Sequence, residues 1–128
     1  MMAVALLRTL RPHQWVKNLF VLAPLIFSKN LLSPEHLGVG LLALLLFCLA
    51  SGVVYLINDL VDVERDRAHP VKRNRPIASG VLPVTTARAA AAVLGPGVLL
   101  GGYALSPALS LVLAGYITLN LFYSVVLK

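Results

Sequence analysis

Long stretches without a charged residue constrain this chain more than any other feature. Between Glu35 and Asp59 lie 23 residues without a charge, enough for a helix to cross a hydrocarbon core of about 30 Å. A further 39 uncharged residues, 89–127, are interrupted at Ser106-Pro107, which predicts two spans joined by a tight turn. Only 12% of the residues are charged, against about 25% in soluble domains, so the composition indicates a membrane protein.

A fourth span, at residues 16–32, is less clear because Lys17 and Lys29 lie near its ends. Lysine side chains can reach back to the membrane interface, so we still expect a helix there. The prediction is an all-α fold, a polytopic membrane helix bundle forming a single domain over residues 1–128. Its expected parts are spans at about 16–32, 36–57, 85–105 and 108–127, the third broken at Gly95-Pro96-Gly97, and a motif loop at 58–84.

The distribution of positive charge predicts the orientation. The chain carries a formal charge of +6, and its basic residues gather before the first span, between the second and third, and at the end of the fourth. We expect a multi-pass protein of the plasma membrane, and the positive-inside rule predicts that both termini and the motif loop face the cytoplasm. Because these charges flank apolar spans, they do not call for nucleic acid as a partner.

Residues 58–80, NDLVDVERDRAHPVKRNRPIASG, hold four of the five carboxylates and five of the eleven Lys and Arg residues. On a helix Asp59, Asp62 and Asp66 follow an i, i+3, i+7 spacing and project from one face. Such a row repels itself unless a cation neutralises it, and Mg²⁺ prefers oxygen ligands. We therefore expect these three aspartates to bind Mg²⁺.

Basic residues follow the acidic row. Pro70 is expected to end the helix near His69, and beyond it come Lys72, Arg73 and Arg75, whose side chains suit phosphate oxygens. Acids on a helix and bases on the adjoining loop predict a diphosphate ester as the ligand. An ordinary solvated loop is the alternative, but it does not require acids that share one face, start at the membrane boundary and precede a helix-breaking proline.

Polar residues also mark the outer spans. Gln14, Lys17 and Asn18 share a helix face at the mouth of the first span. Lys17 fits either a marker of the cytoplasmic helix end or a site residue. Near the end of the fourth span, Asn120 and Tyr123 favour interhelical hydrogen bonding and an aromatic belt when taken alone.

The central segment also carries a family resemblance. The pattern Asn58-Asp59-x-x-Asp62-x-x-x-Asp66 resembles the first aspartate-rich motif, NDxxDxxxD, of the UbiA superfamily of intramembrane prenyltransferases. Residues 69–80 are similar to that family's conserved loop. The resemblance implies a helical bundle, typically of nine spans, with a cavity open to lipid, and about four of those spans lie in this chain. It also implies that Asn58 joins the three aspartates in holding Mg²⁺ against a diphosphate.

A narrower resemblance involves RPHQWVKN at residues 11–18 and YSxxLK at residues 123–128. Both are similar to a branch of the family that transfers phosphoribose from phosphoribosyl diphosphate to a polyprenyl phosphate such as decaprenyl phosphate, on the route to cell-wall arabinan. It implies a diphosphate-releasing transferase in which Asp59, Asp62 and Lys17 are catalytic. The implied substrate-binding residues are Gln14, Lys17, Asn58, Lys72, Arg73, Arg75, Tyr123 and Lys128.

Three alternatives fit the same residues. Prenyl transfer from a prenyl diphosphate to an aromatic acceptor needs the same acids. An ion carrier could use Asp59 and Asp62 as a relay, and a non-enzymatic fragment could pair with a separate C-terminal half. The family's second aspartate-rich motif is expected beyond Lys128, so we expect the chain to be an N-terminal portion.

Overall fold

The computed structural model describes residues 2–22 and 34–126, and every regular element among them is a helix. This confirms the predicted all-α class. In chain order the elements are α1 (Met2–Leu10), the 3-10 helix η1 (Pro12–Leu22), α3 (Pro34–Val61), α4 (Val63–Ala68), the 3-10 turn η2 (Lys72–Asn74), α5 (Pro76–Ser79), α6 (Val84–Leu105) and α7 (Pro107–Val126).

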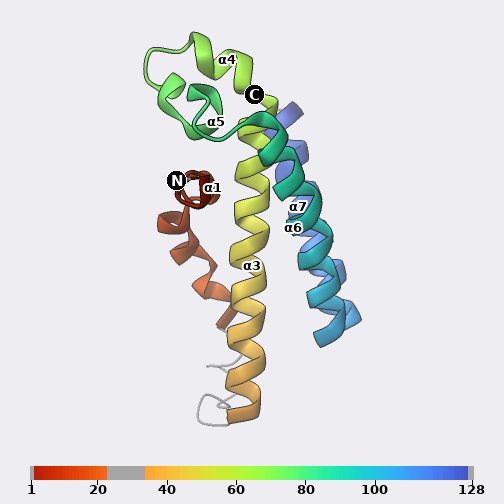
Figure 1. The fold of residues 1–128 in the computed structure, drawn as a ribbon. Coiled ribbons are helices and arrows are strands. Elements are labelled where there is room, and N and C mark those ends of the chain that lie inside the picture. The colour runs from red at the N-terminus through yellow and green to blue at the C-terminus, as the bar shows by residue number, and fades with distance from the viewer. Residues whose placement is uncertain (1, 23–33, 127–128) are drawn as a thin grey trace.

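Three helices are long and apolar enough to cross a membrane: Leu37–Val61 within α3, all of α6, and Pro107–Ser124 within α7. In Figure 1, α3 stands at the centre, with α6 and α7 together on one side and η1 on the other. These helices correspond to the second, third and fourth predicted spans. In the first predicted span, residues 16–22 belong to η1 and residues 23–32 lie outside the described part, so that span stays a prediction.

Apolar and polar contacts together join the long helices. Phe47 and Ala50 of α3, Val98 of α6 and Leu113 of α7 are buried in one cluster. Beside it, the Ser51 hydroxyl of α3 lies 2.8 Å from the Tyr116 hydroxyl of α7 and accepts a hydrogen bond of 3.0 Å from the Asn18 amide of η1. Asn18 and Ser51 are buried and have little water to bind. Their hydrogen bonds with each other and with Tyr116 therefore help to hold η1, α3 and α7 together.

One expectation about the chain path was wrong. The third span is not broken at Gly95-Pro96-Gly97, because α6 runs unbroken from Val84 to Leu105 with Pro96 inside it. Proline removes one backbone donor, but helices in membranes tolerate it where neighbouring groups adjust. Within the motif loop, residues 58–84, α3 continues to Val61 and α4, η2 and α5 follow. The Asn120 side-chain amide donates to the Tyr116 carbonyl of its own helix at 2.8 Å.

Short α1 packs against the motif end of α3, and Figure 1 shows it almost end-on beside the upright α3. Leu10 of α1 and Leu56 of α3 are buried in one cluster with Ile77 of α5 and Leu82. At Gly52 a Cβ atom would lie 3.0 Å from Leu10 Cδ2, so the two helices approach closely there. This packing brings the N-terminal helix and the basic turn to the acidic end of α3.

Candidate functional site

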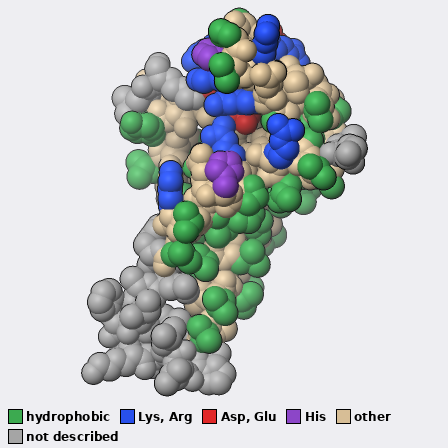
Figure 2. Space-filling view, turned by 90° about the vertical axis from the view of Figure 1, so that its left-hand side faces the viewer, with side chains coloured by type: hydrophobic (Ala, Val, Ile, Leu, Met, Phe, Trp, Pro, Cys, Tyr) green, Lys and Arg blue, Asp and Glu red, His purple; other side chains and the backbone are tan. Residues whose placement is uncertain are grey.

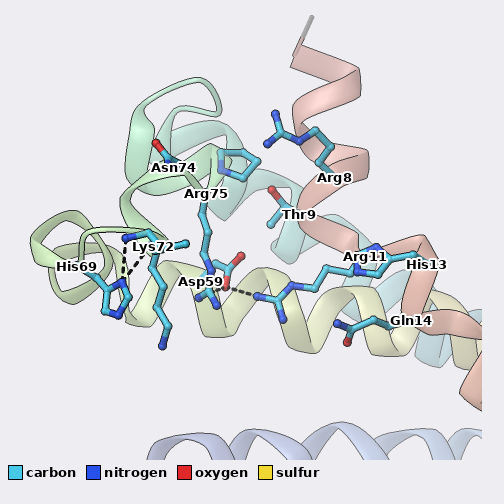
Figure 3. Close-up of a pocket in the computed structure, with 12 residues that line it drawn as sticks. Arg8, Thr9, Arg11, His13, Gln14, Asp59, His69, Lys72, Asn74 and Arg75 are labelled. Atoms are coloured by element: carbon cyan, nitrogen blue, oxygen red, sulfur yellow. Dashed lines mark hydrogen bonds and ion pairs between the residues drawn. The ribbon is translucent and has the colours of Figure 1, made fainter.

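An open cleft of about 740 Å³ lies where the α1–η1 junction, the end of α3 and the turn after α4 meet (Figure 3). Basic side chains dominate its wall, and Asp59 is its one carboxylate among the described residues. Figure 2 shows Lys and Arg side chains gathered at this end of the molecule. The lining residues are Arg8, Thr9, Arg11, His13, Gln14, Asp59, His69, Val71, Lys72, Asn74, Arg75 and Pro76.

The three aspartates of the acidic row are all buried, at 2%, 7% and 3% exposure for Asp59, Asp62 and Asp66. Asp62 lies between α3 and α4 with φ −92° and ψ 7°. The helical hydrogen bonding nevertheless continues, because the Asp62 amide donates to the Asn58 carbonyl at 3.0 Å and the Asp66 amide to the Asp62 carbonyl at 2.7 Å. The α4 helix then ends at Ala68, confirming the expected end near His69.

Arg75 joins the acids to the basic turn. Its Nη1 donates to Asp59 Oδ1 at 3.3 Å and to Asp66 Oδ2 at 3.2 Å, so carboxylates from α3 and α4 converge on one nitrogen. Arg11 Nη2 donates to the same Asp59 oxygen at 3.0 Å. Two guanidinium groups therefore neutralise the buried acids, whereas Asp62 has an ion pair of 4.0 Å with the exposed Arg65.

Arg11 reaches Asp59 from a strained backbone. Its φ of 55° is the only positive value at a non-glycine among the described residues, at the junction of α1 and η1. Such a conformation costs on the order of 1 kcal/mol and persists where the surroundings hold it. The guanidinium carbon lies 4.6 Å from the centroid of the Tyr55 ring, a cation–π distance. Arg11 is thus held by its backbone, by Asp59 and by Tyr55 at the wall of the cleft.

Two of the three aspartates in the acidic row converge on one point. No group of three or more His, Cys, Asp or Glu side chains in the described part of the chain is arranged to hold a metal ion. Asp59 and Asp66, however, both reach one cationic nitrogen within 3.3 Å. Mg²⁺ in such sites typically takes one or two carboxylates and completes its shell with water and substrate phosphates. Two converging carboxylates beside an open basic cleft fit that pattern.

The predicted site residues divide between the cleft and its surroundings. Gln14, Asp59, Lys72 and Arg75 line the cleft. Asp66 on α4 and Asp62 between α3 and α4 are buried, and Asn58 is one residue before Asp59. Lys17 on η1, Arg73 on η2 and Tyr123 on α7 are exposed and do not line it, and Lys128 lies outside the described residues.

Sequence reasoning assigned no role to several residues that the fold brings to the cleft. Arg11 and Asp59 are 48 positions apart, and only the docking of α1 on α3 makes them a pair. The one sequence signal for Arg11 was the block RPHQWVKN, which carried the narrower resemblance. The unassigned lining residues are Arg8, Thr9, Arg11, His13, His69, Val71, Asn74 and Pro76.

The acidic row and the basic turn fall inside the match to a known family. The sequence profile of the UbiA prenyltransferase family matches residues 19–128. The chain belongs to the UbiA prenyltransferase family. Its UbiA match begins after Arg8, Arg11 and Gln14, so the α1–η1 wall of the cleft lies ahead of the part that the family profile covers.

Individual UbiA-like relatives align with that N-terminal wall as well. The chain is 42% identical over 131 residues to a decaprenyl-phosphate phosphoribosyltransferase of Mycobacterium tuberculosis, covering 99% of the chain and 43% of the relative. It is 43% identical over 127 residues to a protein of the same name from Mycolicibacterium smegmatis, covering 96% and 40%. A third, from Corynebacterium glutamicum, is 44% identical over 95 residues, covering 73% and 29%. The chain thus spans less than half the length of these relatives.

Proposed function

We propose that the full protein is a Mg²⁺-dependent membrane transferase that moves phosphoribose from phosphoribosyl diphosphate to a polyprenyl phosphate, with decaprenyl phosphate as acceptor. The product is a precursor for cell-wall arabinan. One observation carries the proposal: buried Asp59 and Asp66 converge on Arg75 at the wall of a basic cleft. A ligand that is anionic and carries a divalent cation suits both parts of that arrangement. The names of the relatives support the choice of donor and acceptor.

Each group of residues has a distinct role in this proposal. Asp59 and Asp66 would hold Mg²⁺, and Asn58 and Asp62 remain predicted ligands. When bound, Mg²⁺ neutralises negative charge that builds on the departing diphosphate. The cations Arg8, Arg11, Lys72 and Arg75 face the cleft and bind phosphate oxygens. Lys17, Arg73, Tyr123 and Lys128 remain predicted substrate contacts.

In this reaction the protein acts mainly by positioning the substrates and not by forming a covalent bond to them. The bond between the anomeric carbon and the diphosphate oxygen breaks, and its electron pair leaves with the diphosphate. A phosphate oxygen of the lipid forms the new bond to the same carbon. Cations fixed on α1 and on the turn after α4 hold the donor in one orientation, which converts a bimolecular encounter into a positioned one.

The placement of the site supports the predicted orientation. The cleft lies at the end of α3 that carries Asp59, beside α1, and the C-terminal end of α7 lies at the same end of the bundle (Figure 1). Soluble phosphorylated donors are cytoplasmic, and basic residues favour that side. We therefore place this end in the cytoplasm and the protein in the plasma membrane.

A transfer assay tests the proposal. The full-length gene product, reconstituted in lipid, is incubated with labelled phosphoribosyl diphosphate, decaprenyl phosphate and Mg²⁺. We expect diphosphate release matched by labelled lipid. Absence of both, together with turnover of a prenyl diphosphate and an aromatic acceptor, would replace the proposal by aromatic prenyl transfer, which uses the same acids.

A further inference from the structure

His69 lies where the acidic helix meets the basic turn, and most of its polar groups are engaged. Its backbone amide donates to the Asp66 carbonyl at 3.1 Å, and its carbonyl accepts from the Arg73 amide at 3.3 Å. Its side-chain Nδ1 accepts from the amides of Val71 and Lys72, both at 3.1 Å. One side chain thus ties two consecutive amides of the turn to the end of α4 (Figure 3).

These two bonds decide the tautomer of the imidazole. Nδ1 accepts, so it carries the lone pair and the proton of the neutral ring is on Nε2. The backbone of His69 is extended, with φ −89° and ψ 138°, the conformation of a residue whose side chain caps a following turn. Asn and Asp commonly perform this role through a side-chain oxygen. Here an imidazole nitrogen takes its place.

The capped turn carries the cations of the cleft. Its hydrogen bonding continues from the Asn74 amide to the Val71 carbonyl at 3.1 Å and from the Arg75 amide to the Lys72 carbonyl at 3.0 Å. His69, Lys72, Asn74 and Arg75 all line the cleft. The position of Arg75 relative to the acids therefore depends on a turn that starts at His69.

We propose that His69 is a positioning residue for diphosphate binding. Through Nδ1 it holds residues 70–75 so that Arg75 reaches Asp59 and Lys72 lines the cleft. The proposal rests on the proposed function for the class of ligand. His69 and the turn residues 70–74 are exposed, so loosening them affects the cleft without removing apolar contacts from the bundle.

Two substitutions separate the ring nitrogens. His69→Asn places a side-chain oxygen where Nδ1 accepts, whereas His69→Gln reaches the position of Nε2 and leaves the turn amides uncapped. Binding of inorganic diphosphate with Mg²⁺ to the full-length protein is measured by calorimetry, and amide exchange of residues 71–75 by mass spectrometry. His36→Gln, near the opposite end of α3, is the matched control.

We expect His69→Gln to weaken diphosphate binding by about tenfold, as the loss of two hydrogen bonds implies, and to speed exchange in the turn. His69→Asn should remain within about threefold of the wild type, with the same thermal midpoint for all variants. Equal diphosphate affinities of the His69→Asn and His69→Gln variants would overturn the proposal. So would binding that His69→Gln retains and His69→Asn loses. If the wild type binds no diphosphate, the proposed function fails, and the exchange rates still decide whether Nδ1 holds the turn.

Discussion

At the scale of single residues, Arg75 connects the two halves of the site. Its guanidinium reaches Asp59 and Asp66 while remaining 29% exposed, and the two carboxylates are almost fully buried. Buried carboxylates without a counter-ion are costly. Arg75 and Arg11 therefore act as the resident counter-ions of the acids, on the wall of a cleft suited to a further anion and its cation.

Asp62 distinguishes the transferase from an ion carrier. Replacing Asp62 by Ala should weaken Mg²⁺-dependent diphosphate binding by about 10- to 100-fold, the range for loss of an outer-shell partner of a metal site. Calorimetry on the full-length protein measures this. Glu64→Ala is the control, since Glu64 is exposed and pairs with Arg67 at 3.4 Å. Unchanged diphosphate binding in Asp62→Ala would favour the carrier.

Two substitutions of Arg11 separate the effect of its backbone strain on stability from the effect of its charge on diphosphate binding. Arg11→Gly relieves the positive φ of 55°, whereas Arg11→Ala keeps it, so the Gly variant should be the more stable by about 1 kcal/mol. Both variants lose the contacts with Asp59 and Tyr55, and both should bind diphosphate more weakly. Thermal unfolding and calorimetry check the two parts. If the Arg11→Gly variant is less stable than the Arg11→Ala variant, the backbone at residue 11 is not strained.

Sequence reasoning at this scale found the acidic row, because helical spacing is a local property. It could not find the Arg11–Asp59 pair, which depends on two helices docking across 48 positions. It also gave no role to His69, whose importance lies in which ring nitrogen faces the turn amides.

At the scale of elements, the docking of α1 decides the shape of the cleft. Leu10 packs on Gly52 of α3, where an added Cβ would lie 3.0 Å from Leu10 Cδ2 and 3.1 Å from its Cβ. Arg8 and Arg11 lie on either side of this contact in the chain. A shift of α1 therefore moves two cations of the cleft.

Gly52→Val should displace α1, destabilise the protein by about 1–3 kcal/mol through overpacking, and weaken diphosphate binding. Gly38→Val on the same helix is the control, because a Cβ added at Gly38 would have nothing within 4 Å. Thermal unfolding and calorimetry compare the two. Equal loss of stability in both variants would contradict the close α1–α3 contact.

Glycine and proline residues marked the ends of a short helix correctly but did not mark a break in a long one. Gly95-Pro96-Gly97 predicted a break that α6 does not have, because a bundle in a membrane stabilises a helix beyond its local preference. Pro76 and Gly80 behaved as their backbone chemistry requires: Pro76 begins α5, and Gly80 ends it at a left-handed φ of 87°.

At the scale of the whole molecule, the three long helices differ in burial. The apolar window of α3 is 39% buried, against 11% for α6 and 6% for α7, so α3 is the central helix. The outward faces of α6 and α7 expose large apolar side chains such as Leu100, Leu111 and Leu119, as suits hydrocarbon. Charge-free windows predicted these helices, whereas their relative burial followed only from the three-dimensional packing.

The central claim is that buried acids and a basic turn together bind a diphosphate through Mg²⁺. Its most direct test is calorimetric titration of inorganic diphosphate into the full-length protein, with and without Mg²⁺, in the wild type and in Asp59→Asn/Asp66→Asn. We predict binding that requires both Mg²⁺ and the intact acids. Equal affinity with and without Mg²⁺, or undiminished binding in the double variant, would contradict the account.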